Sequence, residues 1–401
     1  MLSRQMVAFT FRAYRRLWLA SLGYSLSFWM ERVAVGWFVF DFTGSIFLAA
    51  LAFAAQNLSN MLFGPLAGAV ADRIERPRLL ALTGLTGGII ALSMAVVVVM
   101  SPVSIWLILI LTGLRGAART FEVPAVQALM TDIVGPDHST NAVGAYILGL
   151  RMVSVVGGLG AGLLIEFVGP AAAFFVGGVA ALIGAFGVVG IRGAGPPPEP
   201  ATRSVWSDLV TGLTTMLGDR VVRLLLGLTL LVEIFAFSYH SLLPALAEQA
   251  LQVGPTGLGT LTLFSGLGAI LGSIALALLG SVERRGRILL GVTLGYGVFL
   301  LLVAAADRFY VALFMLLGVG AMAALFDGLQ WILLQDNMPR AMRGRAVGGW
   351  VWAIGLGWVG PLILGGIGEA LGVSAAIAIG GGVVVALAIL ATVFVPGLRR
   401  A

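Results

Sequence analysis

The sequence contains no cysteine and no lysine, only two histidines, and very little charge for its length. Without cysteine the chain can form neither disulfide bonds nor thiolate metal sites. His138 and His240 stand far apart, so neither a metal nor a cofactor is expected. Charged residues make up 10% of the 401 residues, against about a quarter in an average soluble domain, which excludes an ordinary soluble protein.

Long apolar runs rich in glycine take the place of the missing charge, with 59% hydrophobic residues and 56 glycines. A helix needs about 20 mostly apolar residues to cross the hydrocarbon core of a membrane. Only helices and closed barrels satisfy their backbone hydrogen bonds there, and these runs are too long for barrel strands. We therefore predict an all-α membrane protein with twelve transmembrane helices, at 17–40, 46–71, 79–101, 104–128, 141–166, 170–191, 222–247, 256–281, 288–306, 309–334, 345–368 and 373–396.

The 24 arginines indicate how the chain is oriented in the membrane. With the N-terminus inside, the inside loops and both tails carry 19 arginines, whereas the outside loops carry one. Because basic residues stay on the cytoplasmic side, this predicts a multi-pass protein of the inner (plasma) membrane with both termini in the cytoplasm. The net charge of +6 then reflects topology, and no nucleic-acid partner is expected.

A polar, proline-rich segment at the middle of the chain divides it into two halves. Helically spaced apolar residues follow this segment, which predicts an amphipathic helix on the membrane surface. We expect an N-terminal six-helix bundle at 1–192, a cytoplasmic linker containing this helix at 193–221, and a C-terminal six-helix bundle at 222–401.

Two short stretches recur in the second half of the chain. DRIER at 72–76 aligns with ERRGR at 283–287, an offset of 211 residues. QALMTDIVGP at 127–136 aligns with QWILLQDNMP at 330–339, an offset of 203 residues. The pair predicts duplication of a six-helix unit, which is typical of transporters whose substrate site lies between repeats.

The loop after the second predicted helix, GAVADRIERPR at 68–78, resembles the signature of the major facilitator superfamily, Gly-x-x-x-Asp-Arg/Lys-x-Gly-x-Arg/Lys-Arg/Lys. Glu75 replaces the usual glycine and Pro77 interrupts the basic run. The matching residues are Gly68, Asp72, Arg73 and Arg76, and the second-half copy offers Glu283, Arg284, Gly286 and Arg287. The start of the chain, 11–45, is similar to the enterobactin-exporter-like branch of that superfamily and its macrolide-efflux relatives.

The resemblance implies a fold of two pseudo-symmetric six-helix bundles and transport by alternating access. It also implies that these loops form a cytoplasmic gating motif. In this motif Asp72 would sit at the start of the eleventh helix, where free N–H groups favour an anion. Arg76 would form an ion pair with Asp132 at the end of the fourth helix. The alternative is that the loop charges only set topology.

Several charges fall inside predicted membrane helices, where each costs at least about 2.5–3.5 kcal/mol and normally faces a cavity or a partner. At 100° per residue, Arg115, Arg119 and Glu122 lie within about 60° of one another, so they share one face of their helix. Glu31 and Arg32 are adjacent and diverge by about 100°, so they need different partners. We expect Glu31 to pair with Arg115 or Arg119.

Three further charges complete the predicted substrate and proton cavity: Arg151, Glu233 and Asp327. One interpretation is a permanent ion-pair network that only joins helices. The other is a cavity whose carboxylates load and release protons, because burial makes a carboxyl easier to protonate near neutral pH. Glu233 is the first candidate proton carrier, since no basic residue lies near it on its own helix, and Glu31 is the second.

Together these features predict a secondary active transporter that exports an amphipathic small molecule, of drug or siderophore type, by proton antiport. Its expected partners are that molecule, protons and the lipid bilayer, and we expect a monomer. The alternative on the same fold is a facilitator, or a flippase for a lipid or anionic solute, since the surplus of arginine in the first half suits an anion. We find no nucleotide-binding loop and no catalytic constellation, so an enzyme or a non-transporting sensor is a remote alternative.

Overall fold

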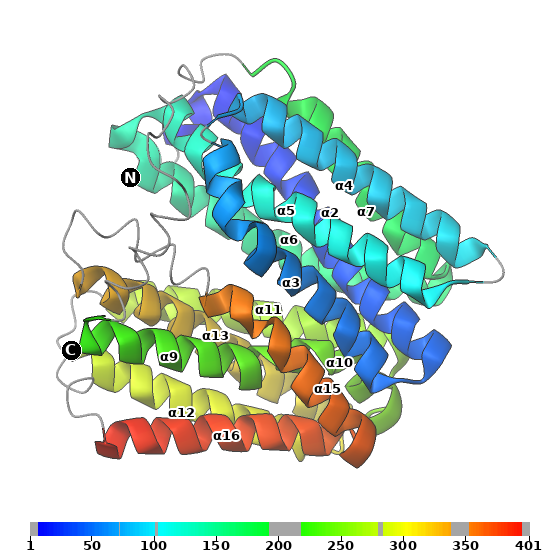
Figure 1. Ribbon diagram of the computed structural model, residues 1–401, viewed down its shortest axis with the longest axis vertical. Helices are drawn as coiled ribbons and strands as arrows, with labels where there is room; N and C mark the ends of the chain where they lie inside the picture. The colour runs from blue at the N-terminus through cyan, green and yellow to red at the C-terminus, as the bar shows by residue number, and fades with distance from the viewer. Residues whose placement is uncertain are drawn as a thin grey trace. The chain divides into compact units, whose positions relative to one another are not determined.

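The computed structural model describes residues 7–71, 73–100, 103–191, 218–279, 284–337 and 353–394. All regular elements in these ranges are helices, as Figure 1 shows, so the predicted all-α class is confirmed. The chain forms two compact units, the first from 1–35 and 58–202 and the second from 36–57 and 203–401. The predicted linker at 193–221, which was expected to contain an amphipathic helix, lies almost wholly outside the described residues.

Most of the first unit consists of the helices that precede the linker. Short 3-10 turns at Val7–Thr10 and Pro136–His138 flank these helices. The long helices are α2 (Arg12–Thr43), α3 (Ile46–Ala71), α4 (Arg76–Val99), α5 (Ile105–Val134), α6 (Ser139–Phe167) and α7 (Pro170–Val188).

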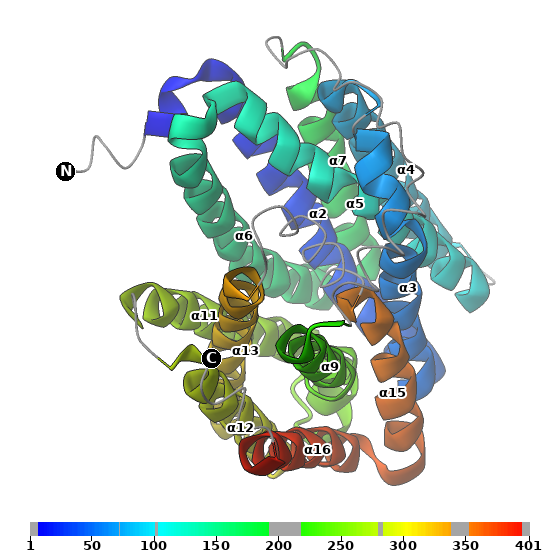
Figure 2. The same ribbon diagram turned by 60° about the vertical axis from the view of Figure 1, so that its left-hand side comes forward.

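Most of the second unit consists of the helices that follow the linker. They are α9 (Arg220–Phe235), α10 (Leu243–Ala245), α11 (Gly254–Leu279), α12 (Arg285–Ala304), α13 (Phe309–Asp336), α15 (Val359–Leu371) and α16 (Val373–Phe394). Within this unit α11 packs along α13 and α12 packs along α16, as Figure 2 shows.

Within the described ranges, ten helical segments are long and apolar enough to cross a membrane. Helices α2 and α5, with 32 and 30 residues, also have the length of a membrane span. Each of them carries at least two charged residues within its span, Glu31 and Arg32 in α2 and Arg115, Arg119 and Glu122 in α5. The two most polar helices of the bundle are therefore the ones that supply the buried charges described below.

Pro77, which breaks the basic run of the signature loop, has a structural role. It lies in the first turn of α4. Proline is favoured there because its missing N–H would have no partner at that position. The helix consequently begins at Arg76, directly after Glu75.

Equivalent glycine contacts in the two units support the duplication that the sequence predicts. A Cβ atom at Gly88 of α4 would lie 3.0 Å from the carbonyl oxygen of Gly178 in α7. A Cβ atom at Gly297 of α12 would lie 2.7 Å from the carbonyl oxygen of Gly381 in α16. In the order of membrane helices, α4 and α12 are the third of their halves, and α7 and α16 are the sixth. The third helix of each half thus crosses the sixth at a close contact between two glycines. The offset from Gly88 to Gly297 is 209 residues, so the predicted offset of 211 for this region is two residues too long.

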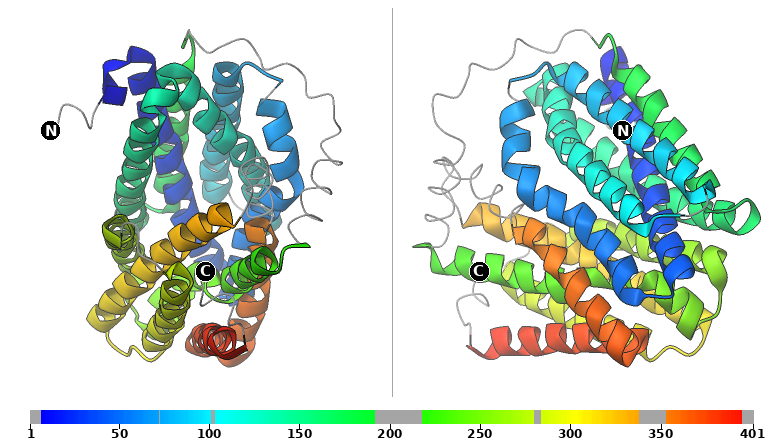
Figure 3. Two further views of the ribbon diagram at one scale, coloured as in Figure 1. Left: turned by 90° about the vertical axis from the view of Figure 1, so that its left-hand side faces the viewer. Right: turned by 45° about the vertical axis from the view of Figure 1, so that its right-hand side comes forward.

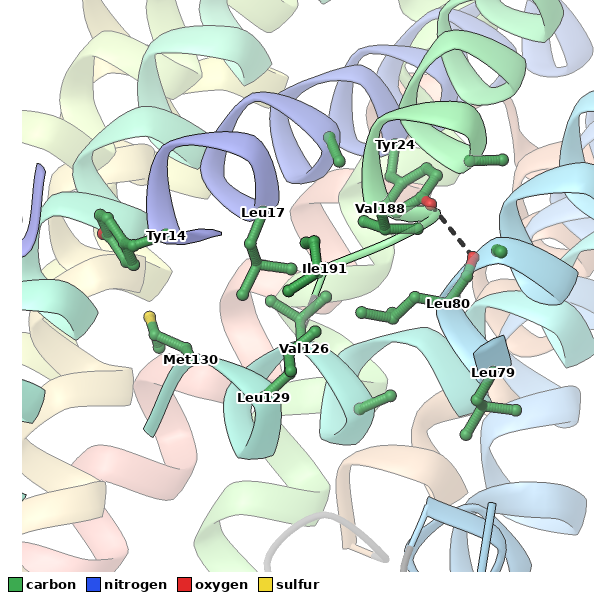
Figure 4. Packing of buried hydrophobic residues seen from close by; sticks show 14 of the residues in the cluster. Tyr14, Leu17, Tyr24, Leu79, Leu80, Val126, Leu129, Met130, Val188 and Ile191 are labelled. Atoms are coloured by element: carbon green, nitrogen blue, oxygen red, sulfur yellow. Dashed lines mark hydrogen bonds between the residues drawn. The ribbon is translucent and has the colours of Figure 1, made fainter. Parts of the chain in front are cut away.

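A cluster of buried apolar residues holds the first unit together, and Figure 4 shows part of it. Leu17 from α2 and Leu129 from α5 are each almost completely buried in it. The Tyr24 hydroxyl donates a 3.0 Å hydrogen bond to the carbonyl oxygen of Leu80, joining α2 to α4. This packing fixes α2 against α4 and α5, the helices that position the buried charges.

The seventh helix is broken, whereas the sequence analysis predicts one continuous helix at 222–247. Helix α9 ends at Phe235 and is followed by a 3-10 turn, the short α10 and a π-helical turn at Leu246–Ala250. Pro244 lies in α10. Gly360 belongs to α15, the eleventh membrane helix. A Cβ atom at Gly360 would come within 2.4 Å of the Ile234 carbonyl oxygen, so α15 crosses the seventh helix closely at the break.

The start of α3 packs against α15 within the second unit, as the right-hand view in Figure 3 shows. Both the Ser45 hydroxyl and the Phe47 backbone N–H donate to a Glu369 carboxylate oxygen, at 3.2 and 3.1 Å. A Cβ atom at Gly365 would lie 2.5 Å from the Ala50 Cβ. This glycine therefore allows the two helices to approach closely.

Candidate functional site in the membrane-spanning helices

Glu31 of α2 and Arg115 of α5 form a buried ion pair. The Arg115 Nε donates to the Glu31 Oε2 at 3.1 Å, and each side chain is 1% exposed. Of the two partners that the sequence analysis offers for Glu31, the structure selects Arg115. Gly87 of α4 makes room for this pair, because a Cβ atom there would lie 2.8 Å from the guanidinium carbon of Arg115.

Arg119 and Glu122 lie one helical turn apart on the same face of α5. The Arg119 Nη1 is 3.6 Å from the Glu122 Oε1, and Glu122 is buried. The Arg119 guanidinium carbon lies 3.8 Å from the centroid of the Phe28 ring, which belongs to α2. Tyr146 of α6 interacts electrostatically with both charges. The predicted common face of Arg115, Arg119 and Glu122 is therefore directed at α2 and α6.

These two ion pairs leave polar atoms unsatisfied. Among the described residues, Glu31 Oε1, Arg115 Nη1, Arg119 Nη1 and Glu122 Oε2 are buried without a hydrogen-bond partner. Buried polar atoms are normally satisfied, so each of these four atoms calls for an explanation beyond the two ion pairs.

Of the other predicted cations of the first unit, Arg32 lies beside the aromatic residues of α2, whereas Arg151 lies on α6. The Arg32 guanidinium carbon lies 5.8 Å from the Phe28 centroid and 5.9 Å from the Trp29 centroid. Arg151 is half-buried in α6, where its carbonyl oxygen accepts a hydrogen bond from Ser154. Sequence reasoning missed Phe28, because one aromatic residue in an apolar helix carries no distinguishing pattern.

In the second unit Glu233 lies near the end of α9, three residues before the break of the seventh helix. Its Oε2 is 3.5 Å from the position of a Cβ atom at Gly357, and the Ser238 hydroxyl donates to its carbonyl oxygen at 3.2 Å. Broken helices of this kind commonly form substrate and ion sites in transporters. Glu233 is half-buried, with its side chain against the start of the eleventh helix.

Tyr296 of α12 lies within electrostatic range of both Glu233 of α9 and Asp327 of α13. It is completely buried, its ring contacts Phe237 edge to face at 5.6 Å, and it interacts electrostatically with both carboxylates. Within the described residues its hydroxyl group has no hydrogen-bond partner. Asp327 is half-buried and precedes the buried Gln330 by one turn. The two second-half carboxylates that were predicted to line a cavity thus both influence the same buried phenol.

The signature loop forms the ion pair that the resemblance implies, between Arg76 and Asp132. A second pair, which sequence reasoning missed, joins Arg285 to Asp336 at 2.5 Å. The aligned sequences DRIER and ERRGR place Arg76 opposite Arg287. In the structure, however, it is Arg285 that forms the equivalent ion pair. The offset of 209 residues between Arg76 and Arg285 equals that between the crossing glycines of α4 and α12.

The remaining residues of the predicted gating motif have less defined roles. Asp72 and Glu283 lie outside the described residues. Arg73, Arg284 and Arg287 are exposed, Gly286 is buried in the first turn of α12, and Gly68 lies in α3. In the described part of the chain there is no group of three or more histidine, aspartate and glutamate residues that could hold a metal ion.

Comparison with known proteins places this geometry in context. Residues 4–399 match the family described as transmembrane secretion effector. The chain is 27% identical over 362 residues to the enterobactin exporter EntS of Shigella boydii serotype 4 (strain Sb227), covering 90% of this chain and 86% of that protein. It is also 27% identical over 304 residues to the enterobactin exporter EntS of Escherichia coli O1:K1 / APEC, covering 75% and 72%.

Solved structures show the same fold at low sequence identity. The crystal structure of nucleoside transporter NupG superposes with a TM-score of 0.74 at 14% identity, covering 94% of this chain and 98% of that one. A POT family transporter in complex with a thioalcohol-conjugated peptide superposes with a TM-score of 0.77 at 12% identity, covering 97% of both chains. These likenesses establish the fold of the chain, and they say nothing about its cargo.

Proposed function

Since the chain belongs to the transmembrane secretion effector family of the major facilitator superfamily, we propose that it exports an amphipathic small molecule of siderophore type in exchange for protons. It is a multi-pass membrane transporter, and the family and its relatives are transporters rather than enzymes. The cargo class is supported by the enterobactin exporters at 27% identity. Alternating access, a monomeric state and cytoplasmic termini belong to the same proposal.

The observation that carries proton exchange is the pair of carboxylate sites within membrane-spanning helices. Glu31 is buried beside Arg115, and Glu233 stands at a helix break beside Gly357. Glu233 is the first candidate proton carrier, because the nearest arginine along α9 is Arg223, about 15 Å away at 1.5 Å per residue. Binding of a proton changes the charge of such a site, and charge inside a membrane is costly. Proton uptake can therefore be coupled to a change of access.

The test is transport in proteoliposomes with enterobactin as the probe. With the lumen more acidic than the bath, exchange for outgoing protons drives accumulation of enterobactin above its equilibrium level. Glu233→Gln abolishes this gradient-driven accumulation and leaves downhill movement. Asp307→Asn is the matched control, because Asp307 is exposed at the end of a loop. Accumulation that ignores the pH gradient would instead support a facilitator or flippase on the same fold.

A further inference from the structure

The first turns of α2 carry three arginines that differ in how they are bonded. The Arg16 Nε and Nη2 donate to the carbonyl oxygens of Gly187 and Val189, at 3.2 and 2.8 Å, so this guanidinium group holds the end of α7 against α2. Arg12 and Arg15 are exposed, and among the described residues neither takes part in an ion pair. These two guanidinium groups are therefore available to an anion from outside the chain.

The exposed side chains of α2 change from charged to apolar within two turns. At 100° per residue, Arg12, Arg15 and Leu19 lie within about 60° of one another, on one outer face of the helix. Leu19 is 62% exposed and lies about 6 Å beyond Arg15 along the axis, at 1.5 Å per residue. On the adjoining α7, Ile183 and Phe186 are 66% and 68% exposed. Cations thus stand next to an apolar surface in the same order as the headgroup and the acyl chains of a phospholipid.

Trp18 marks the depth at which these arginines lie. It is half-buried, its Nε1 donates to a carbonyl oxygen of α6 at 3.1 Å, and its ring meets the Phe9 ring edge to face at 5.2 Å. Tryptophan is enriched at the level of the lipid headgroups, between the hydrocarbon core and water. Arginine side chains on a helix point toward its N-terminus and keep their charge in the polar layer while their stems cover apolar surface. Arg12 and Arg15, both N-terminal to Trp18, therefore reach the depth of the phosphate groups.

We propose that Arg12 and Arg15 bind the phosphate group of an anionic phospholipid, whose acyl chains lie along Leu19 and the outer face of α7. A guanidinium group binds phosphate through paired N–H donors, and the opposite charges strengthen these hydrogen bonds. Two cations without an ion-pair partner among the described residues favour a headgroup of net negative charge over a zwitterionic one. A soluble phosphate shares the chemistry of the headgroup but would leave Leu19, Ile183 and Phe186 uncovered. The site is independent of the cargo and of proton exchange.

The test places a fluorophore beside the site and measures which lipid surrounds it. Ile183→Cys, in a chain that otherwise contains no cysteine, allows a bimane label at this position alone. The protein is reconstituted in phosphatidylcholine nanodiscs that contain nitroxide-labelled phosphatidylglycerol or nitroxide-labelled phosphatidylcholine, with the same acyl chains and at the same mole fraction. The nitroxide quenches bimane only at short range, so the two degrees of quenching give the local preference for the anionic lipid. We expect phosphatidylglycerol to be favoured at least about fivefold, the effect of one arginine at an anionic membrane surface.

Two variants of the labelled protein separate this site from positive charge in general. Arg12→Gln/Arg15→Gln should remove the preference, because the headgroup loses both cations. Arg284→Gln/Arg287→Gln is the matched control, since it also removes two exposed arginines, at the start of α12, and it should keep the preference. All four side chains are exposed and glutamine has a high helix propensity, so both variants should fold. Equal quenching by the two lipids, a preference that survives Arg12→Gln/Arg15→Gln, or equal losses in the two variants would overturn the proposal.

A competition arm separates the lipid from a soluble phosphate. Inorganic phosphate is added in excess, and sodium chloride of equal ionic strength serves as the reference. A preference that is the same in both salts supports the lipid as the occupant. A preference that is lost in phosphate and kept in chloride identifies a soluble phosphate and overturns the lipid assignment. None of these measurements involves transport, so the lipid site and the exporter function stand or fail separately.

Discussion

Gly87 lies directly against Arg115. A Cβ atom at Gly87 would come within 2.8 Å of the guanidinium carbon and of Nη1, and within 3.1 Å of Nε. Those atoms are at the end of a flexible side chain, so the guanidinium group can yield to an added methyl group without movement of α4. Its displacement would break the hydrogen bond from Nε to Glu31.

We therefore predict that Gly87→Ala acts on Glu31 through Arg115. Having lost the hydrogen bond from Arg115, the Glu31 carboxyl should react more readily with dicyclohexylcarbodiimide, a reagent for carboxyls in apolar surroundings. Mass spectrometry at one fixed pH should therefore show more labelling of Glu31 in Gly87→Ala than in the wild type. Gly144→Ala is the control, since nothing lies within 4 Å of its Cβ position. Unchanged labelling of Glu31 in Gly87→Ala would contradict the positioning role.

The crossing of α11 and α13 should tolerate no side chain. A Cβ atom at Gly320 would lie 1.9 Å from the Ser265 carbonyl oxygen, so relief requires backbone movement. We expect Gly320→Ala to cost at least about 1–3 kcal/mol of unfolding free energy, the usual effect of overpacking. Gly291→Ala, whose Cβ position is open, should be neutral. Thermal unfolding in detergent measures both, and a Gly320→Ala protein as stable as Gly291→Ala would refute this packing.

The two ion pairs at the loops should differ in strength. The side chains of Arg76 and Asp132 are 16% and 24% exposed, whereas those of Arg285 and Asp336 are 28% and 52% exposed. Since water screens exposed pairs, we expect the second pair to contribute less than about 1 kcal/mol. Double-mutant cycles with the glutamine and asparagine variants should give the larger coupling energy for the first pair. The reverse order would show that exposure does not govern these contacts.

Glu369 should stabilise the first turn of α3. Its carboxylate accepts from the Phe47 N–H and the Ser45 hydroxyl, in the way that a capping side chain does at a helix N-terminus. Glu369→Ala should cost about 1 kcal/mol and increase hydrogen exchange at the Phe47 amide. Glu248→Ala, at another exposed position of the same unit, should leave that exchange rate unchanged. Equal exchange in the two variants would count against the cap.

Much of the architecture could be predicted from hydropathy and charge. The apolar runs predict the membrane helices, and helical periodicity predicts the shared face of Arg115, Arg119 and Glu122. These features are local, since each depends on the residues of one helix. The pairing of Glu31 is less local, because the sequence alone allows either Arg115 or Arg119 as its partner.

Other features depend on contacts that no local pattern encodes. The break after Glu233 arises where Gly360 crosses the seventh helix, although Pro244 offered a local signal for it. The pair of Arg285 and Asp336 was missed because aligning DRIER with ERRGR by residue identity gives an offset of 211, whereas Arg76 and Arg285 are 209 residues apart. The glycine contacts between α12 and α16 would have given the correct register, and they become visible only in the fold.

The most direct test of the central claim, that carboxylates inside the membrane exchange protons for cargo, is proton movement driven by cargo alone. Proteoliposomes containing a pH-sensitive dye receive enterobactin in the bath at equal pH on both sides. Proton exchange should make the lumen more alkaline as enterobactin enters, and Glu233→Gln should abolish this signal. Entry of enterobactin into wild-type vesicles with no change in lumenal pH would contradict the claim.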